Sequence, residues 1–253
     1  MADIVIFAGT TEGRKLGELC RELGIDALAC VATEYGEALL AAGGSLRVRT
    51  GRLSEERMEE LLEKETPKLV LDATHPYAAE VSVSITKACA ATGVKLARVL
   101  REAESHDGCM EFATTEELAE YLDKVPGVVF SSLGTKEVPA LSKVSGAAER
   151  IWLRILPSID GIKTCLDAGF PAKHIICMQG PFSEELNAAM FRTSGAKYLL
   201  TKDTGRTGGF ADKVNAAQKC GMTVLLLKRP QADTGEGMVF WKEALRSGKW
   251  REL

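Results

Sequence analysis

The sequence predicts an α/β fold made of two Rossmann-like domains, each with a parallel sheet flanked by helices, and an active-site cleft between the domains. Short apolar runs alternate with amphipathic stretches along the 253 residues. Helical patterns flank the apolar runs on both sides, which indicates parallel strands buried on two faces. The alternation is interrupted at Pro126-Gly127, where both periods break. We therefore expect an N-terminal domain over residues 1–127 and a C-terminal domain over residues 128–253.

Each half of the chain alternates strand-like and helix-like segments. In the first half, strands are expected near Ile4–Phe7, Ala27–Val31, Leu46–Val48, Leu69–Leu71 and Leu96–Val99, and helices over Glu12–Leu23, Ser54–Lys64 and Ala78–Ala91. In the second half, strands are expected near Val128–Ser131, Ile151–Arg154, His174–Cys177, Tyr198–Leu200 and Val224–Leu227, and helices over Ser183–Phe191 and Ala211–Cys220.

The charge balance limits the classes of partner. The chain has 32 Lys+Arg against 35 Asp+Glu, a formal net charge of −3, whereas nucleic-acid binders usually carry a basic excess. We therefore expect no nucleic-acid partner. Divided at residue 127, the first half has 14 basic and 23 acidic residues and the second has 18 and 12, giving −9 and +6. The basic half could hold an acidic ligand, or the two halves could simply attract each other.

Hydropathy and cysteine usage indicate a cytoplasmic protein. No apolar run approaches the roughly 20 residues of a membrane span, and the N-terminal residues lack the pattern of a signal peptide. The seven cysteines are scattered without a C-x-x-C pair, which predicts reduced, mostly buried thiols. With only three histidines, we expect no metal-centred active site. Without an apolar run long enough to span a bilayer, we expect no membrane partner.

A glycine- and threonine-rich turn follows the first predicted strand. Gly9 permits a tight turn and Gly13 close backbone packing, while Thr10 and Thr11 offer a helix cap and hydroxyl donors for a pyrophosphate. The turn is not G-x-G-x-x-G, and Glu12 would repel a phosphate unless it points away. Nucleotide binding and simple helix capping both remain open.

Polar residues also follow the fourth strand, at the edge where ligands of α/β sheets bind. The segment 72–78 contains Asp, Thr, His and Tyr within one turn. His75 titrates near neutral pH and could donate a proton or a hydrogen bond. The alternative is that Thr74 or His75 caps a helix begun by Pro76 and that Tyr77 only packs.

In the second half, three polar segments each follow a predicted strand. They are residues 131–136, 179–183 and 201–210. Glycines at 205, 208 and 209 allow close backbone approach, and Lys202, Arg206 and Lys213 supply cations around them. No P-loop and no G-x-S-x-G elbow is present, so ATP hydrolysis and serine hydrolysis are poorly supported.

Seven blocks in order carry a resemblance to a known family. They are Gly9–Arg14, Asp72–Ala78, Gly134–Lys136, Met178–Ser183, Thr201–Asp203, Gly208–Phe210 and Arg229-Pro230. The chain resembles the precorrin-6A reductases, including the cobalt-precorrin-6A reductases of cobalamin biosynthesis. The resemblance implies a nicotinamide-dependent reduction of one double bond in the precorrin-6A macrocycle to the precorrin-6B type of product. It implies no protein-bound metal or flavin, because the hydride comes from the nicotinamide.

The resemblance assigns roles to matching residues. The cofactor phosphates are assigned to Gly9, Thr10, Thr11, Gly13 and Arg14. The polycarboxylate tetrapyrrole is assigned to Thr74, Thr135, Lys136, Gln179, Ser183, Lys202, Arg206 and Lys213, whose cations could instead bind a cofactor phosphate. Candidates for orienting the ring or passing a proton are His75, Tyr77 and Asp203.

The choice of nicotinamide is ambiguous at the second strand. Glu34 could bind the ribose diol of NADH but sits slightly late for that role, while Arg14 could reach the 2′-phosphate of NADPH. NADPH is favoured and NADH remains open. Two other interpretations also stay open: another two-domain α/β tetrapyrrole-modifying oxidoreductase, or a non-catalytic nucleotide-binding regulator.

Overall fold

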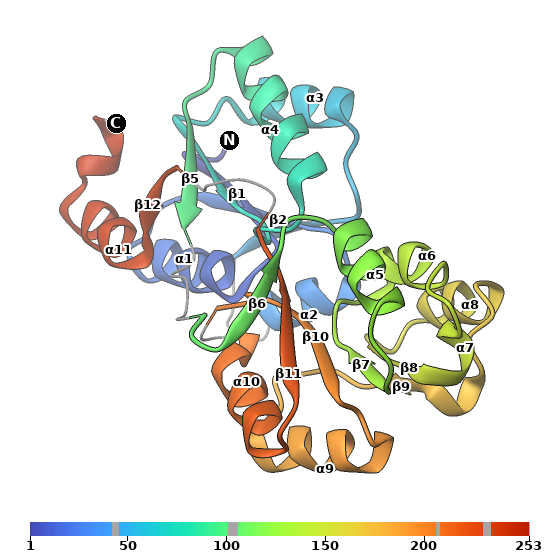
Figure 1. Ribbon diagram of the computed structural model, residues 1–253. Coiled ribbons are helices and arrows are strands. Elements are labelled where there is room, and N and C mark those ends of the chain that lie inside the picture. The colour runs from blue at the N-terminus through green and yellow to red at the C-terminus, as the bar shows by residue number, and fades with distance from the viewer. Residues whose placement is uncertain (42–45, 101–105, 206–207, 230–233, 253) are drawn as a thin grey trace. The chain divides into compact units, whose positions relative to one another are not determined.

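The computed structural model describes residues 1–41, 46–100, 106–205, 208–229 and 234–252 (Figure 1). The chain forms two compact units. Unit 1 comprises Met1–Glu102 and Pro230–Leu253, and unit 2 comprises Ala103–Arg229. Each unit contains a six-stranded sheet, and every pairing between described strands is parallel. Parallel sheets flanked by helices confirm the predicted α/β class.

The sheet of unit 1 has the strand order β12-β5-β4-β1-β2-β3. Its strands are β1 (Ile4–Ala8), β2 (Ala27–Val31), β3 (Arg47–Thr50), β4 (Leu69–Ala73), β5 (Leu96–Leu100) and β12 (Glu236–Gly237). Its helices are α1 (Thr11–Glu22), α2 (Glu34–Ala41), α3 (Glu55–Glu65), α4 (Ala79–Thr92) and α11 (Met238–Ser247), with a final 3-10 turn at Lys249–Arg251.

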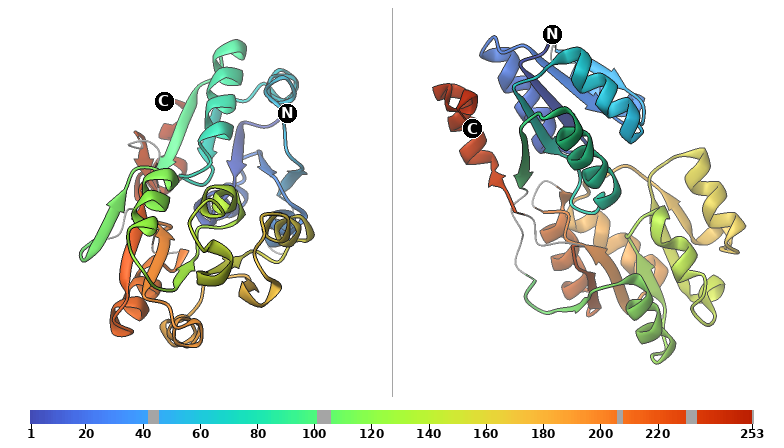
Figure 2. Two further views of the ribbon diagram at one scale, coloured as in Figure 1. Left: turned by 45° about the vertical axis from the view of Figure 1, so that its right-hand side comes forward. Right: turned by 90° about the horizontal axis from the view of Figure 1, so that it is seen from above.

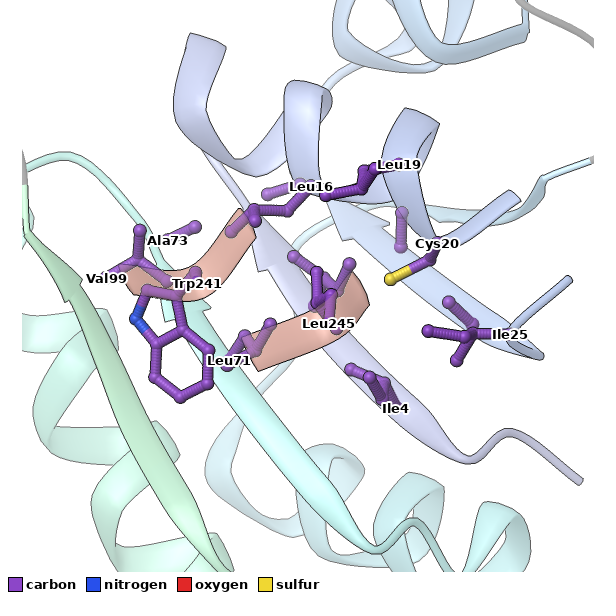
Figure 3. Packing of buried hydrophobic residues seen from close by; sticks show 14 of the residues in the cluster. Ile4, Leu16, Leu19, Cys20, Ile25, Leu71, Ala73, Val99, Trp241 and Leu245 are labelled. Carbon is purple, nitrogen blue, oxygen red and sulfur yellow. The ribbon is translucent and has the colours of Figure 1, made fainter. Parts of the chain in front are cut away.

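Helices cover both faces of this sheet, so the central strands β1, β2 and β4 are buried at every position (Figures 1 and 2). On one face, Leu16 of α1 and Trp241 and Leu245 of α11 pack over the strands, as Figure 3 shows. On the other face, residues of α3 and α4 such as Met58 and Ile85 form a second cluster. Burial on both faces explains why these strands read as continuous apolar runs.

The sheet of unit 2 has the strand order β6-β11-β10-β7-β8-β9. Its strands are β6 (Cys109–Phe112), β7 (Val129–Ser131), β8 (Ile151–Ile155), β9 (Ile175–Cys177), β10 (Tyr198–Lys202) and β11 (Thr223–Leu227). Its α-helices are α5 (Thr115–Asp123), α6 (Val138–Leu141), α7 (Ala147–Arg150), α8 (Ile159–Asp167), α9 (Glu184–Ser194) and α10 (Phe210–Lys219), and its 3-10 helices are η1 (Thr135–Glu137) and η2 (Ala172–His174).

Two apolar clusters hold unit 2 together. One places Leu118 and Leu122 of α5 against strand residues such as Leu200. The other places Phe191 of α9 and Phe210 of α10 against the opposite face of the same sheet. Each buried aliphatic or aromatic side chain contributes about 1.5–3 kcal/mol relative to exposure, so both layers of helices are needed to cover the sheet.

The boundary between the units differs from the predicted one at residue 127. Strand β6 pairs with β11, with Cys109 opposite Val224, so the segment after residue 102 belongs to unit 2. Strand β12 pairs with β5, and α11 packs in the core of unit 1, so the last segment returns to the first unit. Gly127 lies inside unit 2, where the Arg150 guanidinium donates to its carbonyl oxygen at 2.8 Å.

The two compact units differ in net charge much less than the two halves of the sequence do. Unit 1 contains 17 basic and 20 acidic residues, a net charge of −3, and unit 2 contains 15 of each, a net charge of 0. The basic C-terminal half inferred from residues 128–253 is therefore not a property of either compact unit. Basic residues of α11 and the C-terminus lie in unit 1, and the acidic segment around α5 lies in unit 2.

Candidate active site

In unit 1, the turn between β1 and α1 is shaped by Thr10. This residue caps α1, and its Oγ1 accepts a hydrogen bond from the Gly13 N–H at 3.3 Å. The same hydroxyl donates to the carbonyl oxygen of Ala73, at the end of β4, at 2.9 Å. The Thr10 side chain therefore caps α1 and also links the end of β1 to the end of β4.

The glycines of this turn allow its backbone to pack closely against the ends of β1 and β4. A Cβ atom on Gly13 would lie 2.8 Å from the Cα of Ala8, and one on Gly9 would lie 3.3 Å from the Cα of Thr74. The backbone therefore comes close to the ends of β1 and β4 at the start of α1. Amides at a helix N-terminus favour an anion, so the turn fits the pyrophosphate of a dinucleotide.

Arg14 lies in the first part of α1, close to this turn. Its Nη1 forms an ion pair with Glu18 Oε1 at 2.6 Å, one helical turn further on, and the Arg14 side chain is 34% exposed. A partly exposed pair of this kind contributes little to stability. The guanidinium can therefore exchange Glu18 for a phosphate at low cost.

At the end of β4, Thr74 takes part in a buried network. Thr74 Oγ1 donates to Asp72 Oδ1 at 2.7 Å and accepts from Arg98 Nη1 at 2.9 Å. Arg98 Nη1 also pairs with Asp72 Oδ2 at 2.6 Å. This network holds the β4–α4 turn in place. Arg98 was not predicted as a site residue, because its position on β5 gives no local signal of this contact.

His75 and Tyr77 are both half-buried in the same turn. The Tyr77 N–H donates to His75 Nδ1 at 3.3 Å, and the two ring centroids lie 5.6 Å apart. With Nδ1 as acceptor, the neutral imidazole carries its proton on Nε2. The two side chains lie at the carboxyl edge of the sheet of unit 1, beside the glycine turn.

In unit 2, an ion pair joins the end of β10 to the 3-10 helix η1, which follows β7. Lys202 Nζ lies 2.7 Å from Glu137 Oε1, and the Thr115 hydroxyl donates to Glu137 Oε2 at 2.6 Å. Burial raises the pKa of Glu137, but the hydrogen bonds from Lys202 and Thr115 outweigh it, so this pKa lies below its ordinary value. Thr135 and Lys136 occupy the same 3-10 turn, where Thr135 is half-buried and Lys136 is exposed.

Asp203 is fully enclosed, with 1% of its surface exposed. Its Oδ1 accepts from the Gly205 N–H at 2.8 Å. Its Oδ2 lies 3.0 Å from Arg229 Nη2 and 3.3 Å from His106 Nε2. His106 lies near the start of unit 2, and Arg229 is its last residue. Asp203 therefore connects the two ends of the segment that forms unit 2.

The other predicted residues of unit 2 are distributed along the same edge. Gln179 is exposed beyond β9, and exposed Ser183 caps α9 by accepting from the Leu186 N–H at 3.4 Å. Lys213, in α10, is buried and donates to Thr201 Oγ1 at 3.2 Å. Arg206 lies outside the described residues. The predicted residues thus form two groups, one at the carboxyl edge of each sheet.

Unit 2 contains a buried cation that was not predicted as a site residue. Arg154 is the fourth residue of β8 and is 7% exposed. Its Nη1 donates to Asn187 Oδ1 at 2.7 Å. A charged residue within the apolar run Ile151–Ile155 is the signal that could have identified it, because arginine is almost never buried without a partner.

No group of three or more potential metal-ligating side chains occurs in the part of the chain that the structure describes. In the same residues, no helix combines the length and apolar character that a membrane crossing requires. The seven cysteines are free, as expected, and burial raises the pKa of Cys20 and of Cys30 to about 12. These two thiols are therefore protonated and unreactive near neutral pH.

Comparisons with known proteins agree with the sequence resemblance. Residues 3–246 match the family described as precorrin-6x reductase CbiJ/CobK. Cobalt-precorrin-6A reductase of Methanothermobacter thermautotrophicus is 33% identical over 241 residues, covering 94% of this chain and 80% of that protein. Cobalt-precorrin-6A reductase of Priestia megaterium is 30% identical over 236 residues, covering 92% of each chain.

A solved structure of CobK precorrin-6A reductase has the same fold. It superposes with a TM-score of 0.75 at 24% sequence identity, covering 94% of this chain and 92% of that one. The family match extends over both units and includes all seven blocks that carry the resemblance. The chain belongs to the precorrin-6x reductase family.

Proposed function

We propose that this protein reduces one double bond of the precorrin-6A macrocycle, or of its cobalt-containing form, to give the corresponding precorrin-6B. The observation that carries the proposal is the family match over residues 3–246. The two carboxyl-edge groups supply chemistry suited to this reaction, a glycine turn for a dinucleotide in unit 1 and cations for a polycarboxylate in unit 2.

A bound nicotinamide supplies the hydride, and a proton completes the reduction of the double bond. The glycine turn at Gly9 and Gly13 holds the pyrophosphate through backbone amides. His75, Tyr77 and the adjoining β4–α4 turn orient the reacting ring, or His75 delivers the proton from its imidazolium form. The substrate carboxylates bind Lys136 and Lys202, with Thr135, Gln179 and Ser183 as hydrogen-bond partners. In this scheme Asp203, which is buried and paired with Arg229, positions the end of β10.

We further propose that NADPH is the preferred cofactor. Arg14 lies in the first part of α1, and its partner Glu18 is readily exchanged for a 2′-phosphate. Glu34 begins helix α2, three residues beyond the end of β2, and its side chain is exposed. This supports NADPH, because the acidic residue that binds the ribose diol of NADH usually stands at the strand end. We also propose a cytoplasmic location, which is consistent with use of a freely diffusing nicotinamide.

The test is an anaerobic assay with purified protein and each combination of precorrin-6A or cobalt-precorrin-6A with NADPH or NADH. The expected result is oxidation of one equivalent of nicotinamide per macrocycle, together with a shifted tetrapyrrole spectrum. Tight nucleotide binding without any redox change would instead support a regulator. Oxidation of nicotinamide with a different tetrapyrrole only would support another oxidoreductase.

A further inference from the structure

Two cations are buried close together in unit 2, at the carboxyl ends of β8 and β10. Arg154 lies in β8 and Lys213 in the first turn of α10, and each is 7% exposed. Lys213 Nζ donates to Thr201 Oγ1 at 3.2 Å, and Arg154 Nη1 donates to Asn187 Oδ1 at 2.7 Å. Among the described residues, neither cation has a carboxylate within 4.0 Å.

This arrangement is costly for the empty protein. A buried charge without a counter-charge loses hydration that hydrogen bonds to neutral groups replace only in part. Burial, with the added repulsion of Arg154, lowers the pKa of Lys213 to about 7. Burial also lowers the pKa of Arg154 to about 10. An anion placed beside the pair would remove both penalties.

The surroundings hold Arg154 in a fixed orientation. Its guanidinium carbon lies 4.5 Å from the ring centroid of Phe182 and 5.5 Å from that of Phe130. Asn187, which accepts from Arg154, is itself fixed because its amide donates to the carbonyl oxygens of Phe182 and Ser183 at 3.2 and 2.9 Å. A planar guanidinium held in this way is suited to bind two oxygens of one anion.

The guanidinium also keeps donors available. Nη1 is used by Asn187, whereas Nε and Nη2 donate to no protein atom in the described parts of the chain. Both nitrogens can therefore donate to the oxygens of a ligand.

We propose that Arg154 and Lys213 form an oxyanion-binding subsite at the carboxyl edge of unit 2. The subsite takes one carboxylate or phosphate group, held by the fork of Arg154 and the ammonium of Lys213. The choice of ligand rests on the proposed function: the group is either a side-chain carboxylate of the tetrapyrrole or a phosphate of the dinucleotide. The subsite explains why an apolar strand carries an arginine at position 154.

The direct test is a titration of the whole protein with sodium acetate and with inorganic phosphate near pH 7. Carbon-13 NMR of labelled lysine follows the Lys213 signal, which is assigned by its loss in Lys213→Met. The expected result is a saturable shift toward the protonated form, because a bound anion favours the charged ammonium. Sodium chloride at equal ionic strength should not produce it. A Lys213 signal that follows ionic strength alone would overturn the proposal.

Variants test the contribution of each cation. Arg154→Lys keeps the charge but loses the fork, so the acetate or phosphate concentration at half-saturation should rise roughly tenfold, the effect of losing one charge-assisted hydrogen bond. The matched control is Lys219→Met on the same helix, since the Lys219 side chain is 70% exposed and paired with Glu184. This control should titrate like the unmodified protein. Equal titration of the Arg154 variant and the control would contradict a subsite that contains Arg154.

A second pair of titrations identifies the source of the anion. Lys213→Met and Arg154→Lys are compared with Lys219→Met for binding of NADPH and of uroporphyrin, a stable polycarboxylate porphyrin. Weaker binding of uroporphyrin alone assigns the subsite to substrate carboxylates, and weaker binding of NADPH alone assigns it to a cofactor phosphate. Unchanged binding of both ligands overturns the ligand assignment. A protein that binds acetate at Lys213 but reduces no precorrin would retain the subsite and reject the proposed reaction.

Discussion

At the scale of single residues, polar side chains at the strand ends serve mainly to fix the turns that would carry a ligand. Thr10 links β1 to β4, and Thr74 joins the buried pair of Asp72 and Arg98. The sequence places both threonines next to strand ends but does not reveal their partners. The Arg98 contact joins residues 24 positions apart, and such a distance has no local pattern.

Arg14 carries the first prediction. Arg14→Gln should raise the KM for NADPH about tenfold or more and leave the KM for NADH nearly unchanged, because only NADPH has the 2′-phosphate and one charge-assisted hydrogen bond contributes about 1.5–3 kcal/mol. Steady-state kinetics with both nicotinamides measures this. Arg21→Gln, in the last turn of the same helix, is the matched control. An equal loss for both nicotinamides would show that Arg14 does not contact the 2′-phosphate.

Lys213 predicts a pH dependence of stability. Burial and Arg154 lower its pKa from 10.5 to about 7 in the folded chain. Between these values the unfolded chain binds a proton that the folded chain does not, so the free energy of unfolding rises with pH by roughly 1.4 kcal/mol per unit. Below about pH 7 both states are protonated, and the cost of the buried charge is constant.

Lys213→Met removes this contribution. Urea unfolding at about pH 7, 8 and 9 measures this for both proteins. As the pH rises, the unfolding free energy of the unmodified protein should increase relative to that of the variant. Lys219→Met should run parallel to the unmodified protein. Parallel behaviour of Lys213→Met as well would show that Lys213 keeps an ordinary pKa in the folded chain.

At the scale of elements, the strands buried on two faces were predictable, as were the edge strands β3 and β9, whereas the edge strands β6 and β12 were not. β1, β2 and β4 are continuous apolar runs because helices cover both faces. Strand β6 at a sheet edge is half-exposed and contains Met110 and Glu111 among its four residues, so it has no apolar run. Strand β12 has two residues, too few for any period.

The glycine turn of α1 gives a prediction at this scale. Gly13→Ala would place a Cβ 2.8 Å from the Cα of Ala8, so α1 must move relative to β1. The free energy of unfolding should fall by about 1–3 kcal/mol, as for an overpacked site, and NADPH should bind more weakly. Gly237→Ala, with open space at its Cβ and an ordinary φ of −77°, is the control for thermal unfolding and nucleotide titration. Equal stability of the two variants would contradict the close packing at Gly13.

At the scale of the whole molecule, the chain leaves unit 1, completes unit 2 and returns. Neither the return nor the early start of unit 2 could be predicted, because both depend on which strand joins which sheet edge. Pro126-Gly127 lies in the connection between α5 and β7 within unit 2 and is not a linker between the units. The separation into −9 and +6 was a result of that boundary. The binding of an acidic ligand is therefore ascribed to individual cations such as Lys202, Arg154 and Lys213, and not to the net charge of a domain.

The division predicts which fragment folds. Residues 103–229 contain a complete sheet with helices on both faces, so this fragment should unfold cooperatively on its own. Residues 1–127 lack α11, whose Trp241 and Leu245 are 1% and 3% exposed in the core of unit 1. Losing the burial of these two side chains alone costs about 3–6 kcal/mol, which is a large part of the free energy of unfolding of an ordinary domain. Circular dichroism melting of both fragments measures this, and a cooperative transition in 1–127 but not in 103–229 would contradict the division.

The proposed reaction is tested most directly by the anaerobic assay with precorrin-6A or cobalt-precorrin-6A and a reduced nicotinamide. We expect one equivalent of NADPH to be oxidised for each macrocycle reduced, with the spectral changes of the tetrapyrrole and of the nicotinamide following the same time course. Binding of both ligands with neither spectrum changing, for the metal-free and the cobalt-containing precursor alike, would contradict it.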